Sequence, residues 1–201
     1  MVAIIDYGMG NVASVQKALN FLGVKSVITS DHDAIRHSSV ILLPGVGSFA
    51  QGMANLQERD LVSLLTDEVV NKQKPFLGIC LGMQLILEKG NEPYECSGLG
   101  WIEGEVKKFE LVDRNIPHMG WNNIEVLKDR YYKNILTKDF YFIHSYHVVP
   151  SNAEDIAATV DYGFDVVASV QKKNIFATQF HPEKSQSAGL SILKTFFDLN
   201  A

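Results

Sequence analysis

The chain has 201 residues, of which 46% are hydrophobic and 20% charged, with a formal net charge of −5. This composition is typical of a folded globular protein with a substantial core, and it excludes a disordered chain. The net charge gives no basis for nucleic-acid binding, and no apolar run approaches the roughly 20 residues that cross a bilayer. The first six residues lack the features of a signal peptide, and the two cysteines, Cys80 and Cys96, argue against a disulfide framework. We therefore expect a cytoplasmic protein that binds neither nucleic acid nor membrane, and we expect no chemical role for Cys96.

The first half of the chain alternates between short apolar runs and helical patterns. Asn11 is a good N-cap for a helix with Val15 and Leu19 on one face, and Gly23 ends that helix. Buried strands are expected at residues 2–5, 24–29, 40–43 and 76–79, and the stretch 49–71 is expected to be mostly helical. This alternation predicts a parallel sheet.

The second half is rich in β patterns. Strands are expected at residues 106–109, 124–127, 140–149, 156–160, 166–170 and 174–180, before a closing helix over 187–199. No repeat, low-complexity tract or linker interrupts the chain. We therefore expect one domain over residues 1–201, of α/β class, with a central, mostly parallel sheet flanked by helices and antiparallel β additions in the second half.

Cys80 lies between two glycines in the run Gly78-Ile79-Cys80-Leu81-Gly82, after an apolar strand pattern and before a helical pattern over 83–88. A small residue on each side of a nucleophile, at a strand-to-helix turn, is the pattern of a nucleophile elbow. The N-terminus of the following helix favours the thiolate form of the cysteine. The alternative is a small buried cysteine at a strand end.

His181 ends a strand-like run and has a carboxylate two residues further on, in Gln179-Phe180-His181-Pro182-Glu183. In extended chain, residues two apart point to the same side, so Glu183 can reach the imidazole. The other ring nitrogen is then free to face the thiol, which predicts a triad of Cys80, His181 and Glu183. A structural pair of a histidine and an acid would give the same local pattern.

Other site classes have weaker support. Residues 8–13 match a dinucleotide-binding pattern, with Asp31 and Asp33 about 20 residues further on, but a dehydrogenase leaves the cysteine elbow unexplained. In α/β-hydrolases the acid precedes the histidine by a long interval, which is the reverse of the order here. His144 and His147 are three apart in a strand pattern and face opposite ways, so we expect neither a metal site nor a cofactor.

Six motifs spread along the chain resemble those of the class I, triad-type glutamine amidotransferases. They are residues 5–11, 43–47, 77–84, 117–122, 144–146 and 180–185. The elbow and the His-Pro-Glu run are common to the whole class. The opening Asp-Tyr-Gly and the run Pro-His-Met-Gly-Trp-Asn resemble the subgroup that supplies ammonia for imidazole glycerol phosphate synthesis. The resemblance implies a flavodoxin-like fold.

Attack on an amide carbonyl requires donors for the oxyanion that forms. The backbone N–H of Leu81, directly after the nucleophile, is the natural first donor. The resemblance implies the N–H of Val46 as the second, in a glycine-flanked peptide that a partner could flip into place. It also assigns glutamine binding to the backbone of Gly47, Ser145 and Tyr146 and to the side chain of Gln84.

The resemblance further implies a partner, because ammonia made here must reach an acceptor site that this chain does not encode. In the subgroup resembled, the partner is a (βα)₈-barrel cyclase that forms a heterodimer with the glutaminase and yields imidazole glycerol phosphate for histidine and AICAR, a carboxamide ribotide used for purines. Very similar glutaminases feed sugar amidotransferases in surface polysaccharide synthesis, which remains the alternative. Candidate docking segments are residues 6–11, residues 117–122 with Met119 and Trp121, and Lys184.

Overall fold

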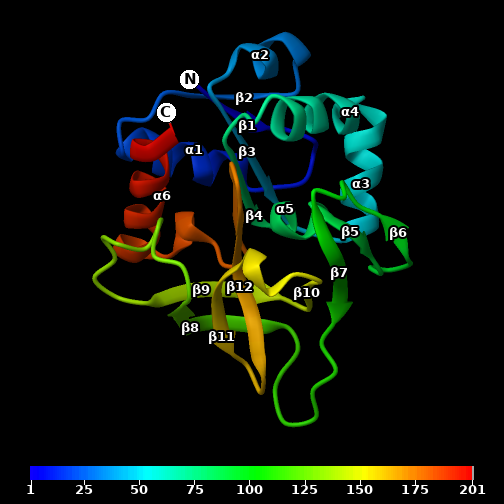
Figure 1. The fold of residues 1–201 in the computed structure, drawn as a ribbon, viewed down its shortest axis with the longest axis vertical. Coiled ribbons are helices and arrows are strands. Elements are labelled where there is room, and N and C mark those ends of the chain that lie inside the picture. Colours follow the sequence, from blue (N-terminus) through cyan, green and yellow to red (C-terminus); the bar gives the residue numbers. More distant parts are fainter. Residues whose placement is uncertain (201) are drawn as a thin grey trace.

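The computed structural model describes residues 1–200, and its centre is a nine-stranded sheet (Figure 1). The strand order is β2-β1-β3-β4-β13-β12-β11-β8-β9. The first five strands are parallel: β2 (Ser26–Thr29), β1 (Val2–Ile5), β3 (Val40–Gly45), β4 (Phe76–Cys80) and β13 (Ile175–Thr178). The other four continue the sheet in antiparallel pairing: β12 (Asp165–Lys172), β11 (Ile156–Asp161), β8 (His118–Val126) and β9 (Asp139–His144). The predicted parallel core with antiparallel additions is confirmed.

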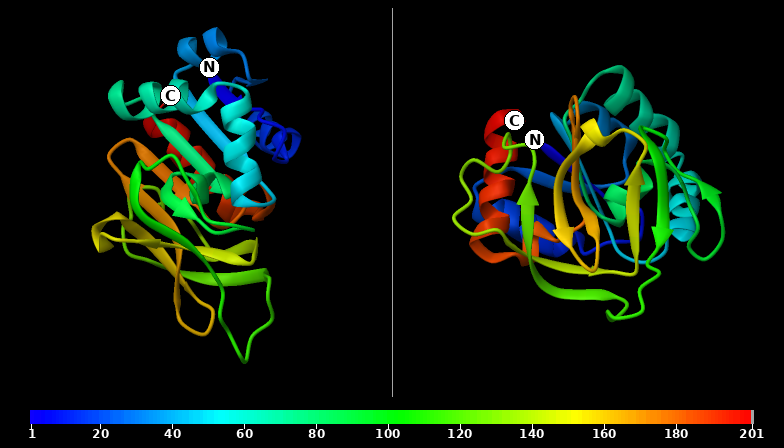
Figure 2. Two further views of the ribbon diagram at one scale, coloured as in Figure 1. Left: turned by 90° about the vertical axis from the view of Figure 1, so that its right-hand side faces the viewer. Right: turned by 60° about the horizontal axis from the view of Figure 1, so that its bottom comes forward.

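A second sheet of four strands, in the order β10-β7-β5-β6, lies beside the first. Its strands are β10 (Tyr146–Pro150), β7 (Ile102–Lys108), β5 (Leu87–Gly90) and β6 (Cys96–Ser97). The single strand expected over residues 140–149 is therefore wrong, because the chain leaves β9 at Ser145 and enters the second sheet as β10. Figure 2 shows the two sheets and the bend between them. The reason for the break is tertiary, since β9 pairs with β8 and β10 pairs with β7.

Helices cover both faces of the parallel part of the sheet. Helices α1 (Val12–Phe21) and α6 (Gln186–Asn200) pack on one face, and α3 (Phe49–Glu58), α4 (Leu61–Thr66) and α5 (Leu81–Leu85) pack on the other (Figure 1). The remaining helical segments are α2 (His32–His37), a π-helical segment (Asp67–Asn71) and two 3₁₀ turns (Ala153–Asp155 and Pro182–Lys184). Within residues 1–200, no helix is long and apolar enough to span a membrane.

Capping residues close to each end explain where helix α1 begins and ends. The side chain of Asn11 accepts a hydrogen bond from the backbone N–H of Ser14, and Gly23 has φ +73°, which confirms both predicted ends of α1. The helix expected over residues 83–88 instead ends at Leu85, and Leu87–Gly90 forms β5. This run is too apolar for its periodicity to separate a buried helix from a buried strand, and pairing of β5 with β7 decides the outcome.

Candidate active site

Cys80 lies at the end of β4 in a backbone conformation that L-residues rarely adopt, with φ +55° and ψ −109°. Such a conformation costs about 1–3 kcal/mol and occurs mostly at functional sites. Two glycines make the turn sterically feasible: a Cβ on Gly78 would lie 2.9 Å from the carbonyl oxygen of Gly82, and one on Gly82 would lie 1.9 Å from that of Leu43. The strand-to-helix elbow predicted around Cys80 is therefore confirmed, although the helix that follows, α5, has only five residues.

His181 and Glu183 are in direct contact, as predicted. The distance from Nδ1 of His181 to Oε1 of Glu183 is 2.8 Å, and both side chains are 2% exposed. The conformation differs from the expected extended chain, because Pro182–Lys184 forms a 3₁₀ turn that brings the carboxylate back to the ring. The backbone of His181 is held on both sides: its N–H donates to the Tyr141 carbonyl, and its carbonyl accepts from the Ser185 hydroxyl.

The second ring nitrogen of His181 lies near the nucleophile. Nε2 is buried and makes no aligned hydrogen bond within the described residues, yet the charge of Cys80 acts strongly on this imidazole. Burial by itself lowers the pKa of His181, but the negative charges of Cys80 and Glu183 outweigh burial and raise the pKa to about 10. Such loose alignment is common before substrate binds. The arrangement can move a proton between sulfur and imidazole.

Gln179 is a site residue that sequence reasoning missed. Its Nε2 lies 3.7 Å from Sγ of Cys80, and its Oε1 accepts a hydrogen bond of 3.1 Å from Nε2 of Gln84. Gln84 also donates to the carbonyl of Tyr146, at 3.1 Å. The available signal was spacing, because Gln179 precedes His181 by two residues in the predicted strand, where residues two apart face the same side. In the structure β13 ends at Thr178, just before Gln179.

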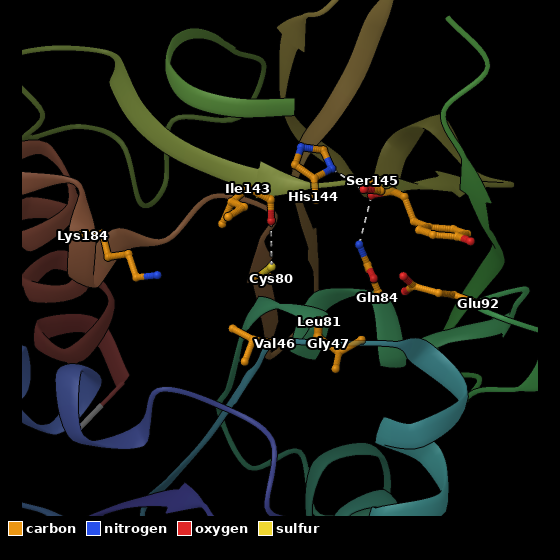
Figure 3. A pocket seen from close by; sticks show the side chains of 11 residues that line it. Val46, Gly47, Cys80, Leu81, Gln84, Glu92, Ile143, His144, Ser145 and Lys184 are labelled. Carbon is orange, nitrogen blue, oxygen red and sulfur yellow. Dashed lines mark hydrogen bonds between the residues drawn. The ribbon is translucent and has the colours of Figure 1, made fainter. Parts of the chain in front are cut away.

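A pocket of about 230 Å³ opens over the Cys80 sulfur (Figure 3). The structure brings all the predicted oxyanion and glutamine residues to its lining: Val46, Gly47, Leu81, Gln84, Ser145 and Tyr146. In Figure 3 the elbow and the loop at Val46 form one wall, and the junction of β9 and β10 forms the other. Lys184 stands at one end, and Gln84 and Glu92 stand at the other.

Glu92 also lines this pocket, although no sequence signal marked it. Its side chain is only partly exposed, and burial raises the pKa of its carboxyl group. A carboxylate at the end of the pocket away from Lys184 is a suitable partner for an ammonium group. The pocket therefore combines a nucleophile, backbone donors and a carboxylate, and the base His181 is buried beside the nucleophile. These are the groups needed to bind and cleave an amino-acid amide.

The loop that carries Val46 is placed by strand pairing. Gly45, the last residue of β3, pairs in register with Cys80 at the end of β4, so the Val46–Gly47 peptide lies beside the elbow. A side chain at Gly45 is excluded, because its Cβ would lie 2.2 Å from the Tyr7 hydroxyl and 2.8 Å from Cβ of Leu81. Both expected oxyanion donors thus lie next to the nucleophile.

The acidic residues of the dinucleotide pattern have other partners in the structure. The carboxylates at the expected ribose position are used locally: Asp31 caps α2 by accepting from the Ala34 N–H, and Asp33 pairs with Arg36. Among residues 1–200, no group of three or more His, Cys, Asp or Glu side chains is arranged to hold a metal ion. The structure therefore directs attention to the cysteine pocket.

Residues 3–199 match the family described as glutamine amidotransferase class-I, and the chain belongs to that family. Two solved structures share its fold. One is a glutamine amidotransferase with a TM-score of 0.78 and 17% identity, covering 100% of this chain and 99% of that one. The other is PurLQS from Thermotoga maritima, with a TM-score of 0.73 and 17% identity, covering 98% of this chain and 97% of that one. These likenesses support the α/β fold alone.

Relatives of higher sequence identity indicate the subgroup of the family that this chain resembles most. The chain is 50% identical over 199 residues to "Imidazole glycerol phosphate synthase subunit HisH 1" of Campylobacter jejuni, covering 98% of each chain. It is 46% identical to the protein of the same name from Methanococcus maripaludis, covering 99% of this chain and 100% of the relative. It is 47% identical to "Imidazole glycerol phosphate synthase subunit HisH" of Bacillus cereus, covering 98% and 93%.

Proposed function

We propose that this chain is the glutaminase subunit of an imidazole glycerol phosphate synthase, folded as one glutaminase domain over residues 1–201. It hydrolyses L-glutamine to glutamate and ammonia and delivers the ammonia to a cyclase subunit in histidine biosynthesis. The observation that carries the proposal is the strained Cys80 elbow facing the buried His181–Glu183 pair in a pocket of suitable size. The names of the relatives at 46–50% identity support the pathway.

The reaction begins with proton transfer. His181 takes the proton of the Cys80 thiol at Nε2, and the sulfur attacks the side-chain amide carbon of glutamine. The resulting oxyanion accepts hydrogen bonds from the backbone N–H groups of Leu81 and Val46. His181 then returns the proton to the leaving nitrogen, the C–N bond breaks, and ammonia departs as the thioester forms. Water, deprotonated by His181, hydrolyses the thioester to glutamate and restores the thiol.

The ends of the pocket set the orientation of glutamine. Glu92 is placed to pair with its α-ammonium group, and Oε1 of Gln84 is available as a further acceptor because its Nε2 is already engaged with Tyr146 and Gln179. The backbone at Gly47, Ser145 and Tyr146 completes the binding of the α-carboxylate. The side-chain amide then extends toward Cys80.

Ammonia must leave without meeting bulk water, where it becomes ammonium and loses its nucleophilicity. An exposed apolar surface on β8 and β9 adjoins the pocket: Met119 is 62% exposed and Trp121 49%, and Trp121 packs against Tyr141. Met119 pairs in register with Ile143, which lines the pocket, and Lys184 lies over the Tyr141 ring. We propose this surface, together with residues 6–11, as the docking face for a (βα)₈-barrel cyclase in a cytoplasmic heterodimer.

The test measures glutamate release from glutamine by the chain alone, with a barrel cyclase plus its ribulosyl ligand, and with a sugar amidotransferase. Stimulation by the cyclase supports the proposal, and stimulation only by the sugar enzyme transfers the same chemistry to the other pathway. Cys80→Ala is expected to abolish glutamine-dependent activity while ammonia-dependent synthesis by the complex continues. Cys96→Ala is the matched control, because that thiol lies outside the pocket. Glutamate release by Cys80→Ala would contradict the assignment.

A further inference from the structure

Two buried histidines that the proposed reaction does not use lie beside the glutamine pocket. His118 on β8 and His144 on β9 face each other directly in the antiparallel register and are 3% and 6% exposed. Nδ1 of His118 lies 3.0 Å from Nε2 of His144. Burial lowers the pKa of His118 to about 4 and, as the main cause, that of His144 to about 3, so both rings are neutral at physiological pH.

Hydrogen-bond geometry assigns the tautomer of each ring. Nδ1 of His144 lies 2.8 Å from the carbonyl oxygen of Tyr146, which can only accept, so His144 carries its proton on Nδ1. Nε2 of His144 is therefore an acceptor, and His118 must donate to it from Nδ1. Nε2 of His118 is then an acceptor in turn, and the side-chain amide of Asn122 lies 3.5 Å away to donate to it. All three bonds run in one direction.

The Tyr146 carbonyl also accepts a hydrogen bond that belongs to a second series of contacts, which leads to Cys80. Gln84 donates to the Tyr146 carbonyl and to Oε1 of Gln179, and Gln179 reaches the sulfur of Cys80. Figure 3 shows His144 on the β9 side of the pocket and Gln84 on the side of the elbow, so the two donors to this carbonyl come from different elements. A continuous series of polar contacts thus runs from Asn122 to Cys80, and the Tyr146 carbonyl is its midpoint.

We propose that His118 and His144 are positioning residues of the glutaminase reaction, which act by holding the Tyr146 carbonyl and, through Gln84, the glutamine end of the pocket. The proposal rests on the proposed function and deepens it. The strand that supplies His118 and Asn122 on its inner face presents Met119 and Trp121 on its outer face. A partner seated on the outer face therefore contacts the strand that anchors the pocket from within.

The packing around His118 allows a clean substitution. Its ring stacks on Tyr162 at 3.9 Å and on Phe142 at 4.7 Å between centroids, so His118→Phe keeps the aromatic stack and removes both ring nitrogens. His144 then loses its donor, and its ring is free to change tautomer and release the Tyr146 carbonyl. His118→Asn is the conservative variant, because its amide nitrogen can occupy the position of Nδ1.

His147→Phe is the matched control. His147 is 8% exposed and stacks on Phe109 at 4.9 Å, but within residues 1–200 its ring makes no hydrogen bond to the chain of contacts described above. The substitution therefore alters a comparably buried histidine, three residues from His144, without touching the Tyr146 carbonyl. It separates general loss of packing from loss of the hydrogen bonds.

The experiment measures glutamine KM and kcat for wild type and the three variants in complex with the cyclase and its ribulosyl ligand. His118→Phe should raise the KM for glutamine about tenfold or more, because releasing the Tyr146 carbonyl from His144 costs about one buried hydrogen bond at the substrate end of the pocket. Ammonia-dependent synthesis should be unchanged. His118→Asn should restore most of the affinity, and His147→Phe should keep the wild-type KM. An unchanged KM in His118→Phe, or an equal rise in His147→Phe, would overturn the proposal while leaving the glutaminase assignment intact.

A spectroscopic measurement on the wild-type chain tests the arrangement itself. Nitrogen-15 shifts of the imidazoles should show the Nδ1-protonated tautomer for both His118 and His144. An Nε2-protonated His144 would overturn the proposal, because that ring could not then donate to the Tyr146 carbonyl. Wild type that releases no glutamate from glutamine with any partner would instead overturn the proposed function.

Discussion

Glu183→Gln tests the electrostatic role of the carboxylate with the least change in shape. The contact of 2.8 Å between Glu183 and His181 is buried, and each side chain is 2% exposed. The imidazolium that forms when Cys80 gives up its proton is stabilised by this carboxylate. The amide keeps the volume of the side chain and removes its charge, so the substitution isolates the ion pair from the packing.

The magnitude follows from Coulomb attraction. Opposite charges about 4 Å apart at an effective dielectric constant of about 20 attract by about 4 kcal/mol. Losing that stabilisation of the imidazolium in the transition state corresponds to a fall in kcat of about a thousandfold. Oε2 of Glu183 is buried and has no hydrogen-bond partner within residues 1–200. The amide of the variant therefore either leaves its NH2 group unpaired there or turns that group toward the N–H of His181, and both orientations are unfavourable.

Steady-state glutamate release by the stimulated complex measures the effect, and ammonia-dependent synthesis by the same complex is the control for folding and docking. The pKa of His181, raised to about 10 with Glu183 present, should fall in the variant because one of the two neighbouring negative charges is gone. NMR titration of the ring measures that shift. A loss in kcat of less than about tenfold, with the ring still titrating near its original position, would refute the reasoning.

Three further predictions concern the turn, the docking face and the buried histidines. Gly82→Ala should unfold the chain or lower its unfolding free energy by more than about 3 kcal/mol, since the added Cβ would lie 1.9 Å from a backbone oxygen. Gly100→Ala should lower the unfolding free energy by only about 1–2 kcal/mol, because its Cβ meets open space and only its positive φ is strained. Urea denaturation of both variants compares the two effects. Trp121→Ala should weaken cyclase binding by about tenfold to a hundredfold in a calorimetric titration without changing the melting temperature. Leu199→Ala, at a 53% exposed side chain in the last turn of α6, far along that helix from Lys184, should change neither. The lowered pKa values of His118 and His144 mean that the unfolded chain binds more protons than the folded chain between about pH 6.5 and 4. The stability that these neutral rings contribute is therefore present above pH 6.5 and is lost as the pH falls, at about 1.4 kcal/mol per pH unit for each ring. Urea denaturation of His118→Phe and wild type at pH 6.5 and 4.5 should show a smaller loss of stability in the variant, and an equal loss in both would contradict the prediction.

The residues of the candidate triad could be predicted because each belongs to a short pattern with a local cause. The turn at Cys80 needs small residues on either side, and His181 lies two positions from the acid it contacts. The predicted contact of His181 with Glu183 is present, but the predicted conformation is wrong, because a 3₁₀ turn and not an extended chain brings the two side chains together. Because only one residue separates His181 from Glu183, both an extended chain and a 3₁₀ turn can bring the carboxylate to the imidazole.

The rest of the site depends on pairings that no local pattern specifies. Glu92 lines the pocket from a loop between β5 and β6, and its position follows from how the second sheet packs beside the first. The break at Ser145 has the same origin, because β-rich sequence on both sides favours one long strand until the separate partners β8 and β7 are known. Residues distant in sequence and close in space carry no signal in a single chain.

Parallel pairing explains why so many polar groups converge at one edge of the large sheet. Strands β3, β4 and β13 are neighbours and end at the same level, which brings Gly45, Cys80 and the Gln179–His181 segment together although they lie far apart in the sequence. Those ends supply the nucleophile, its base and one wall of the pocket. The opposite wall comes from the antiparallel strand β9, whose Ile143 carbonyl lies 3.9 Å from the Cys80 sulfur. A partner that docks on β8 and β9 therefore acts on the wall that closes over glutamine, while the strained elbow beneath it is held by the sheet itself.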